Sequence, residues 1–285
     1  MPRSDQLNAM TVDVEDYFQV QAFAGCIQRE DWDSLPCRVE SNTDRLLSQF
    51  AEANTVATFF TLGWVAARYP ALIRRIVDAG HELASHGHGH QLVHQLSPAE
   101  FREDLQRAKG TLEDVGGVTV KGYRAPTFSI GPQNSWAFDV LAETGHLYSS
   151  SVYPVRHDLY GAPDAPRFAH RVASGSLLEI PLTTLRLGHN NFPIAGGGYF
   201  RLMPYSVFKA ALKRFNASEK RAGIFYFHPW EIDADQPRVT GASRLGRFRH
   251  YVNIGAVPRR LDKLLRDFRW TRMDDVFAAD IAASR

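Results

Sequence analysis

Histidines are concentrated in one short segment of the sequence, where they alternate with glycines. The segment 81–90 holds four histidines, and His86 and His90 stand four residues apart. This spacing brings two imidazole nitrogens to one metal ion if the turn is helical, and glycine lets the backbone approach the ion closely. The simpler interpretation is a flexible histidine-rich loop that binds metal only incidentally.

Three carboxylates are grouped at the end of the first apolar run. Asp13 and Glu15 alternate and so share one face of an extended strand, while Asp16 falls on the following loop. Clustered carboxylates repel one another, and a protein tolerates them best where a cation or a catalytic step requires them. Two histidines and one carboxylate make a three-ligand site with open positions, as catalytic zinc requires. The alternative is a polar strand end that caps a helix.

Two further residues with chemical potential follow apolar runs. Arg124 stands just before Ala125-Pro126, where it can orient a carboxylate or stabilise an anionic intermediate; the alternative is a surface ion pair. His228 follows an aromatic run and precedes Pro229 and Trp230. A histidine there is well placed as a general acid near neutral pH, with a hydrogen-bonded core histidine as the alternative.

Alternating strand and helix patterns would position these residues. Apolar runs predict strands at 9–14, 56–62, 82–85, 120–124, 147–149, 177–183, 199–202, 223–227 and 270–273. Helical patterns lie between them, at about 42–53, 70–79, 98–115, 135–143, 204–215 and 257–268. This alternation predicts a parallel sheet, open or closed into a barrel, with functional residues just after the carboxyl ends of the strands.

The composition is that of an ordinary globular enzyme. Of the 285 residues, 44% are apolar, 22% charged and 12% aromatic, which excludes a disordered chain, collagen and a coiled coil. Neither a repeat nor a low-complexity linker is visible, which favours one domain. No apolar run approaches the roughly 20 residues of a membrane helix, and no signal segment is visible. We therefore expect no membrane span and a cytoplasmic location.

The formal net charge is only +2, and the basic residues are scattered. Their densest group, Arg244–Arg249, is too short for a nucleic-acid-binding surface and contains no reader motif. We therefore expect no nucleic-acid partner, and we interpret this group as a solvated or substrate-facing loop. Cys26 and Cys37 could form only one disulfide, and we predict free thiols.

Taken in order, four stretches of this sequence resemble the motifs of the polysaccharide deacetylase family, the NodB-homology carbohydrate esterases of family four. They are 10–18, 85–90, 124–128 and 227–231. From about residue 8 to 277 the chain is similar to deacetylases encoded with exosortase-linked (PEP-CTERM) exopolysaccharide clusters. The resemblance implies an α/β fold, a single-domain distorted (β/α) barrel over 1–285 with fewer than eight strands. It also implies that 236–285 is a subgroup-specific C-terminal extension.

The resemblance also implies roles for individual residues. Asp13 becomes the catalytic base, His228 the general acid, and His86 and His90 ligands of one divalent metal ion, usually zinc. The family's first motif has two adjacent aspartates, whereas here Val14 follows Asp13. The acidic metal ligand is therefore Asp16 or Glu15: spacing in family variants favours Glu15, and the reach of the loop leaves Asp16 open.

One partner stays unidentified at this stage. Many family members keep an acidic residue in the segment that corresponds to 148–152, but this sequence has none there. The group that orients His228 is therefore not named. We expect Arg124 to orient Asp13, and a backbone N–H between Tyr123 and Ala125 to donate to an oxyanion.

These expectations amount to a hydrolase that removes N-acetyl groups from hexosamine residues of a glycan or exopolysaccharide precursor. Its partner would be an N-acetylated glycan, and the sequence does not indicate an oligomeric state. Two alternatives remain open, a metal-independent cyclic-amide hydrolase on the same fold and a non-catalytic glycan-binding protein.

Overall fold

The computed structural model describes residues 6–158 and 160–283; the predicted domain bounds Met1 and Arg285 lie outside this part. Its strands are β1 (Leu7–Val14), β2 (Thr58–Thr61), β3 (Glu82–Ser85), β4 (Gly122–Tyr123), β5 (Tyr148–Ser149), β6 (His170–Val172), β7 (Leu177–Glu179), β8 (Thr184–Leu187), β9 (Asn190–Pro193), β10 (Ile224–Phe227) and β11 (Arg269–Thr271). Its α-helices are α1 (Val39–Glu52), α2 (Gly63–Arg68), α3 (Pro70–Asp78), α4 (Pro98–Gly116), α5 (Trp136–Glu143), α6 (Gly197–Leu202), α7 (Tyr205–Glu219), α8 (Arg244–Tyr251), α9 (Val257–Asp267), α10 (Met273–Val276) and α11 (Ala278–Ala282).

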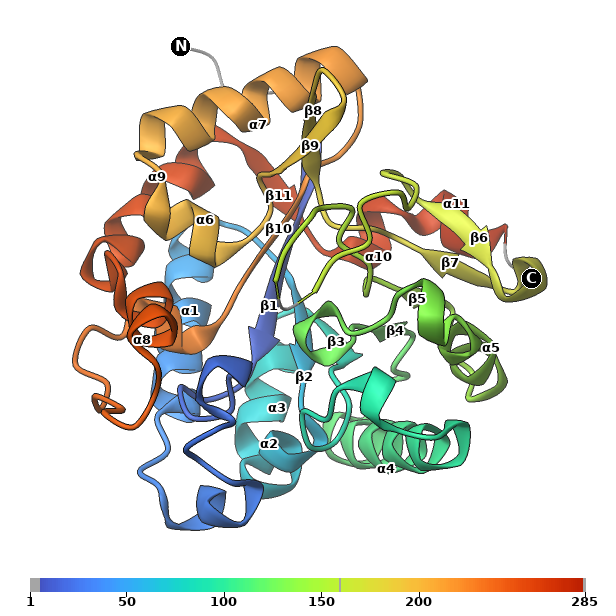
Figure 1. Ribbon diagram of the computed structural model, residues 1–285, viewed down its shortest axis with the longest axis vertical. Coiled ribbons are helices and arrows are strands. Elements are labelled where there is room, and N and C mark those ends of the chain that lie inside the picture. Colours follow the sequence, from blue (N-terminus) through green and yellow to red (C-terminus); the bar gives the residue numbers. More distant parts are fainter. Residues whose placement is uncertain (1–5, 159, 284–285) are drawn as a thin grey trace.

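A mostly parallel sheet forms the centre of the molecule (Figure 1). Its strands follow the order β10-β1-β2-β3-β4-β5-β7-β6, and β11 also pairs with β1. Thr11 of β1 pairs with both β10 and β2, so β1 lies between these two strands. In the part of this sheet that the structure describes, β6 alone runs antiparallel to its neighbour, and β8 and β9 form a separate antiparallel hairpin. The carboxyl ends of β10, β1, β2, β3 and β4 therefore meet at one edge of the sheet.

Five of the helices that pack around the sheet, α3, α4, α5, α7 and α9, lie where their sequence signals predict them. α4 begins with the predicted capping box: the Ser97 hydroxyl accepts from the Glu100 amide, and the Glu100 carboxylate accepts from the Ser97 amide. Pro98 occupies the first helical position, where its missing N–H costs no hydrogen bond. α3, α5, α7 and α9 also lie within about four residues of their predicted bounds. The predicted α/β architecture is thus confirmed.

Residues 199–202 form part of helix α6, and the predicted strand there is wrong. The run reads as a strand because Tyr199 and Phe200 are aromatic. In the fold, Phe200 is buried against Phe208 of α7 and Phe225 of β10, with ring centroids 4.9 and 5.1 Å apart. Tertiary packing has therefore overridden local strand propensity.

Two other segments also differ from the sequence-based expectation. The predicted loop around Arg244–Arg249 is helix α8, which the Ser243 hydroxyl caps by accepting from the Gly246 amide at 3.0 Å. Helix α1 begins at Val39 instead of near residue 42, and the Asp16 carboxylate accepts hydrogen bonds from the amides of Arg38 and Val39 at this end. The strands β6, β8 and β9 were not predicted, because none of them is a fully buried apolar run.

Two further expectations concern thiols and membranes. Cys26 and Cys37 are both free thiols, as predicted. Within residues 6–158 and 160–283, none of the helices combines the length and the apolar character needed to cross a membrane.

Candidate active site

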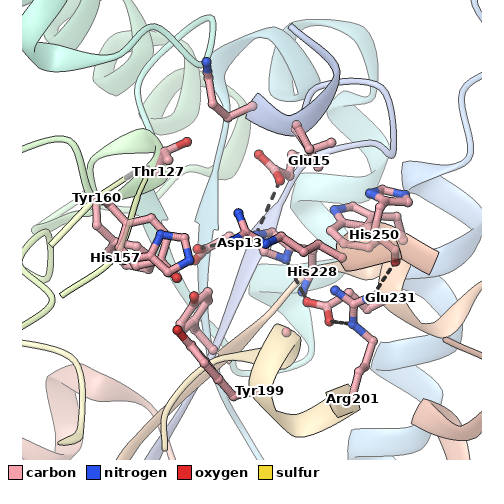
Figure 2. Close-up of a pocket in the computed structure, with 18 of the residues that line it drawn as sticks. Asp13, Glu15, Thr127, His157, Tyr160, Tyr199, Arg201, His228, Glu231 and His250 are labelled. Carbon is pink, nitrogen blue, oxygen red and sulfur yellow. Dashed lines mark hydrogen bonds and ion pairs between the residues drawn. The ribbon is translucent and has the colours of Figure 1, made fainter. Parts of the chain in front are cut away.

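Five of the seven predicted site residues come together at the carboxyl ends of β1, β3 and β10, which belong to the same sheet. There they surround a cavity of about 390 Å³ (Figure 2). Asp13 and Glu15 come from β1 and the residue after it, His86 and His90 from the loop after β3, and His228 from the end of β10. All five line the cavity, whereas Arg124 lies behind it and Asp16 faces away from it. These side chains therefore follow strand ends, where functional groups are expected in folds of this type.

Glu15, His86 and His90 form a three-residue cluster with the chemistry of a metal site. Their ligand atoms all lie within 4.8 Å of one another. Nδ1 of His86 donates to the carbonyl oxygen of Arg124 at 2.8 Å, which leaves Nε2 for a ligand. Oε2 of Glu15 is buried beside Nε2 of His90 at 2.7 Å but accepts no hydrogen bond from the described residues. A buried acceptor without a donor, next to two imidazoles, fits a divalent cation.

The backbone of the histidine loop is bent, and this bend brings the two imidazoles together. Gly87 and His90 both have left-handed conformations, with φ of 76° and 56°. The i, i+4 pair is therefore assembled by an irregular turn and not by the helical turn that its spacing suggests. The loop is packed into the structure, since His86 and His88 are both buried.

Electrostatics favour the metal-binding forms of two of the three residues, Glu15 and His86. Burial alone would raise the pKa of Glu15, but the neighbouring charges of His90 and His228 outweigh it and lower this pKa to about 2. Burial lowers the pKa of His86 to about 4. At neutral pH the carboxyl is therefore ionised and the imidazole of His86 is neutral, which are the protonation states that bind metals.

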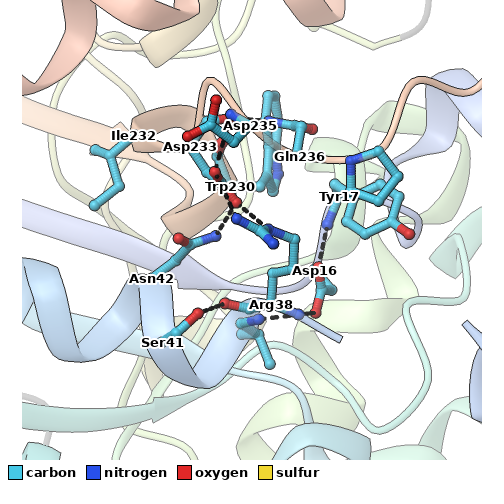
Figure 3. A network of polar contacts seen from close by, with 12 residues as sticks. Asp16, Tyr17, Arg38, Ser41, Asn42, Trp230, Ile232, Asp233, Asp235 and Gln236 are labelled. Atoms are coloured by element: carbon cyan, nitrogen blue, oxygen red, sulfur yellow. Dashed lines mark hydrogen bonds and ion pairs between the residues drawn. The ribbon is translucent and has the colours of Figure 1, made fainter. Parts of the chain in front are cut away.

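Asp16 has a different place in the structure, shown in Figure 3. One carboxylate oxygen accepts from the amides of Arg38 and Val39, at 2.6 and 2.8 Å, and the other accepts from the amide of Tyr17 at 2.9 Å. Arg38 in turn forms an ion pair with Asp233. Asp16 thus ties the loop after β1 to the first turn of α1. Of the two acidic candidates, the structure brings Glu15 to the histidines.

Asp13 is held by a buried arginine. Nη1 of Arg124 lies 2.6 Å from Oδ1 of Asp13 and 2.8 Å from the Thr11 hydroxyl, and the guanidinium stacks over Phe60 at 4.1 Å. The side chain of Arg124 is fully buried, so the alternative of a surface ion pair is excluded. The other oxygen of Asp13 lies 4.0 Å from Nε2 of His228. Arg124 therefore fixes one carboxylate oxygen while the cavity receives the other.

The expected backbone donors next to Arg124 are already used. The Arg124 amide donates to the Ser85 carbonyl at 2.9 Å, and the Ala125 amide donates to the Ser151 hydroxyl at 2.9 Å. These two amides are therefore not available to an oxyanion. The next wall of the cavity is formed by Thr127, whose backbone is left-handed with φ of 54°.

His228 has an acidic partner that the sequence analysis missed. Its Nδ1 donates to Oε1 of Glu231 at 2.8 Å, and Oε2 of Glu231 accepts from Nε of Arg201 at 2.7 Å. Glu231 and Arg201 are both buried. A Cβ on Gly197 would come within 2.3 Å of both Glu231 carboxylate oxygens, so only glycine leaves room for them. The His-Pro-Trp-Glu spacing was the available signal, since it matches a capping box.

The surroundings of His228 favour its charged form. Burial alone would lower the pKa of His228, but the carboxylates of Glu15, Glu231 and Asp13 outweigh it and raise this pKa to about 9. The imidazole also stacks on Trp230, whose other neighbour is the ring of His250, 4.0 Å away. His228 is thus held by its ring face as well as by Nδ1.

Comparison with known proteins divides the chain into two parts. Residues 31–148 match the model of the family "Polysaccharide deacetylase", and residues 150–278 match "Domain of unknown function (DUF3473)". Segments of the chain are also similar to curated deacetylases. These matches support the polysaccharide deacetylase family. The second match is consistent with the exosortase-linked subgroup, which itself stays a prediction.

Three relatives illustrate the similarity to polysaccharide deacetylases. A peptidoglycan-N-acetylglucosamine deacetylase of Bacillus cereus is 29% identical over 84 residues, 30% of each chain. A chitooligosaccharide deacetylase of Bradyrhizobium sp. is 29% identical over 111 residues, 39% of this chain and 48% of the relative. A peptidoglycan deacetylase of Helicobacter pylori is 30% identical over 113 residues, 40% and 38% of the two chains. The chain thus matches less than half of the length of each relative.

Solved structures show the same fold. The crystal structure of a "putative polysaccharide deacetylase from Mycobacterium smegmatis" superposes with a TM-score of 0.62 at 21% identity, over 99% of this chain and 94% of that one. The Xyl-CE4 domain of a xylanase from a Trinervitermes trinervoides hindgut metagenome gives 0.51 at 14% identity, over 97% and 92%. The predicted distorted (β/α) barrel of the polysaccharide deacetylase type is therefore confirmed.

Proposed function

We propose that this protein is a metal-dependent hydrolase that removes N-acetyl groups from hexosamine residues of a glycan or exopolysaccharide precursor. One observation carries the proposal. Asp13 and His228 face the same cavity beside the Glu15–His86–His90 cluster. A buried arginine holds the carboxylate of Asp13, and a buried carboxylate holds the imidazole of His228. A glycan-binding protein has no need for an oriented base and an oriented acid together.

The cluster would hold one divalent cation. Two histidines and one carboxylate match the three-ligand donor set of catalytic zinc sites, so zinc is the metal we propose. When bound, such a cation lowers the pKa of water towards about 7 and polarises a carbonyl oxygen.

Asp13 and His228 would divide the two proton transfers of amide hydrolysis. The free oxygen of Asp13 takes a proton from the attacking water, while Arg124 keeps the carboxylate in position through the other oxygen. As the C–N bond breaks, Nε2 of His228 gives its proton to the departing amine. Glu231 keeps Nδ1 protonated, so that Nε2 is the atom that faces the cavity.

The walls of the cavity suit a sugar. Phe128, Tyr160, Tyr199 and Tyr226 line it, and aromatic rings pack against the apolar faces of sugar rings while tyrosine hydroxyls offer polar contacts. The names of the relatives support an N-acetylated hexosamine, since they are deacetylases of peptidoglycan and of chitooligosaccharides. An exopolysaccharide precursor is the form of this substrate that the predicted subgroup favours.

Metal analysis combined with acetate release tests the proposal. We expect purified protein to hold one divalent ion and to release acetate from N-acetylchitohexaose, and chelation to abolish this activity. Asp13→Asn should keep the metal and lose about a thousandfold in kcat, the scale of general-base catalysis. The exposed Asp78→Asn on α3 is the matched control and should behave like wild type.

Three results would overturn the proposal. Full activity of Asp13→Asn would refute the role of Asp13 as the general base. Hydrolysis of cyclic amides by metal-free protein would favour the cyclic-amide alternative, and glycan binding without any acetate release would favour the binding protein.

A further inference from the structure

Helix α8 presents different faces to two adjacent hollows. Arg249 and His250 line the candidate active cavity. Arg244, Arg247 and Tyr251, at helical spacings of three and four residues, line a second pocket of about 400 Å³. Phe248 lines both hollows, so the second pocket adjoins the first.

The second pocket is lined by three arginines. Arg238, Val239 and Thr240 form its other wall, and no acidic residue lines it among the described residues. The ion pairs found between described residues include none to Arg238, Arg244 or Arg247. Nε of Arg247 is buried and has no hydrogen-bond partner in this part of the chain. We call this hollow the arginine pocket.

Arg249, on the same helix, is paired with a carboxylate. Its Nη1 lies 2.9 and 3.2 Å from the two carboxylate oxygens of Asp158, which belongs to the loop on the opposite side of the active cavity. The three arginines of the arginine pocket have no such partner among the described residues. Their positive charge is therefore not offset by a carboxylate in that part of the chain.

The walls of the arginine pocket are fixed to each other. The hydroxyl of Tyr251 donates to the carbonyl of Pro237 at 3.1 Å and accepts from the amide of Val239 at 2.8 Å. The guanidinium of Arg238 stacks on the Tyr251 ring at 4.2 Å. The pocket is therefore preorganised, which lowers the entropy that a ligand would have to give up on binding.

Charge and geometry together indicate the ligand. Guanidinium groups of like charge repel one another, and a cleft lined by one sign of charge concentrates ions of the other sign. Arginine also presents donors in a planar fork that matches carboxylate and phosphate groups. We propose that the arginine pocket binds an acidic group, carboxylate or phosphate, on the same saccharide whose N-acetylated sugar occupies the active cavity. This inference rests on the proposed function and makes its substrate an acidic glycan.

Binding measurements on the full-length, metal-loaded protein test the inference without relying on catalysis. The probes are hyaluronan hexasaccharide, which carries uronate carboxylates, UDP-N-acetylglucosamine, which carries a diphosphate, and neutral N-acetylchitohexaose. We expect calorimetry at low ionic strength to show about tenfold tighter binding of an acidic probe than of the neutral one, the effect of one charge-assisted hydrogen bond. High salt should reduce this preference. The preferred acidic probe identifies the group as carboxylate or phosphate.

Paired double variants decide whether the arginine pocket is responsible. Arg244→Gln with Arg247→Gln should abolish the preference and raise KM about tenfold for the preferred acidic probe, with kcat and the values for N-acetylchitohexaose unchanged. Arg74→Gln with Arg266→Gln removes the same charge from exposed sites on α3 and α9 and should keep the preference.

Equal binding of all probes by wild type, or a preference that survives in the Arg244/Arg247 variant, would overturn the inference. An arginine-dependent preference without acetate release from any probe would support the pocket and refute the proposed function.

Discussion

The two sides of the active cavity are built in different ways. On the metal side, Glu15, His86 and His90 follow β1 and β3 directly, and the backbone of two short loops places them. On the acid side, His228 depends on a chain of side chains that reaches Glu231 and then Arg201 of α6. The first side is positioned by strand register, and the second by contacts between segments distant in sequence.

The two family models match regions that separate the histidines of one side of the cavity from the residues of the other side. The histidine loop falls in the region that matches the polysaccharide deacetylase model, whereas His228, Glu231 and Arg201 fall in the region that matches DUF3473. The histidines of the proposed metal site and the side chains that support the proposed acid therefore fall under two different family models.

The largest effect is expected on the metal side, where neighbouring carboxylates have different roles. Glu15→Gln should weaken metal affinity by more than about a hundredfold, beyond the usual cost of losing an outer-shell partner. Asp16→Asn should keep the metal but lower the free energy of unfolding by about 1–3 kcal/mol, because the buried amides of Arg38 and Val39 lose a charged acceptor. Metal titration and chemical denaturation measure the two quantities.

Loss of the metal in Asp16→Asn, with the metal kept in Glu15→Gln, would show that Asp16 is the acidic ligand. The proposed difference between the two sides of the cavity would then be wrong.

A smaller effect is expected on the acid side. Glu231→Gln should lower kcat roughly 10- to 100-fold, part of the contribution of a general acid, because Nδ1 of His228 loses its carboxylate acceptor. KM and metal content should stay near the wild-type values. This result would show that the variant disturbs the position of the acid and does not disrupt the whole site. Glu231→Asp should recover part of the kcat, and the exposed Glu103→Gln serves as control. A variant with unchanged kcat, or one that loses its metal, would refute this role for Glu231.

The last effect is expected on stability and not on catalysis, and it concerns a buried carboxyl at the first residue of β3. Glu82 of β3 accepts hydrogen bonds from the hydroxyls of Thr58 and Tyr148 and from the amide of Asp274. Burial, together with the neighbouring carboxylate of Asp274, raises the pKa of Glu82 from 4.5 to about 7. The folded state therefore holds this proton more tightly than the unfolded state, so the stabilising contribution is present below pH 4.5 and is lost as the pH rises to about 7.

Thermal unfolding across this pH range tests the titration of Glu82. Relative to Glu82→Gln, which cannot ionise, wild type should become progressively less stable between about pH 4.5 and 7. The exposed Glu103→Gln should follow wild type. Parallel pH profiles for wild type and Glu82→Gln would show that Glu82 does not titrate in this way.

The sequence alone predicted the elements whose signals involve residues close together in the chain. Short apolar runs predicted β1, β3 and β10, and the capping box predicted α4, because apolar runs and helix capping depend on residues a few positions apart. The same locality identified Asp13, His86, His90 and His228, since parallel strands bring their carboxyl ends to one edge.

Only the tertiary structure decided the remaining contacts. Glu15 and Asp16 are neighbours with the same chemistry, and their roles separate because α1 approaches Asp16 from more than twenty residues away. Arg201 reached Glu231 only because residues 197–202 form a helix against the core, contrary to their strand propensity. Periodicity reports which face of an element is apolar, but the partner of a buried charge depends on which distant segment packs against it.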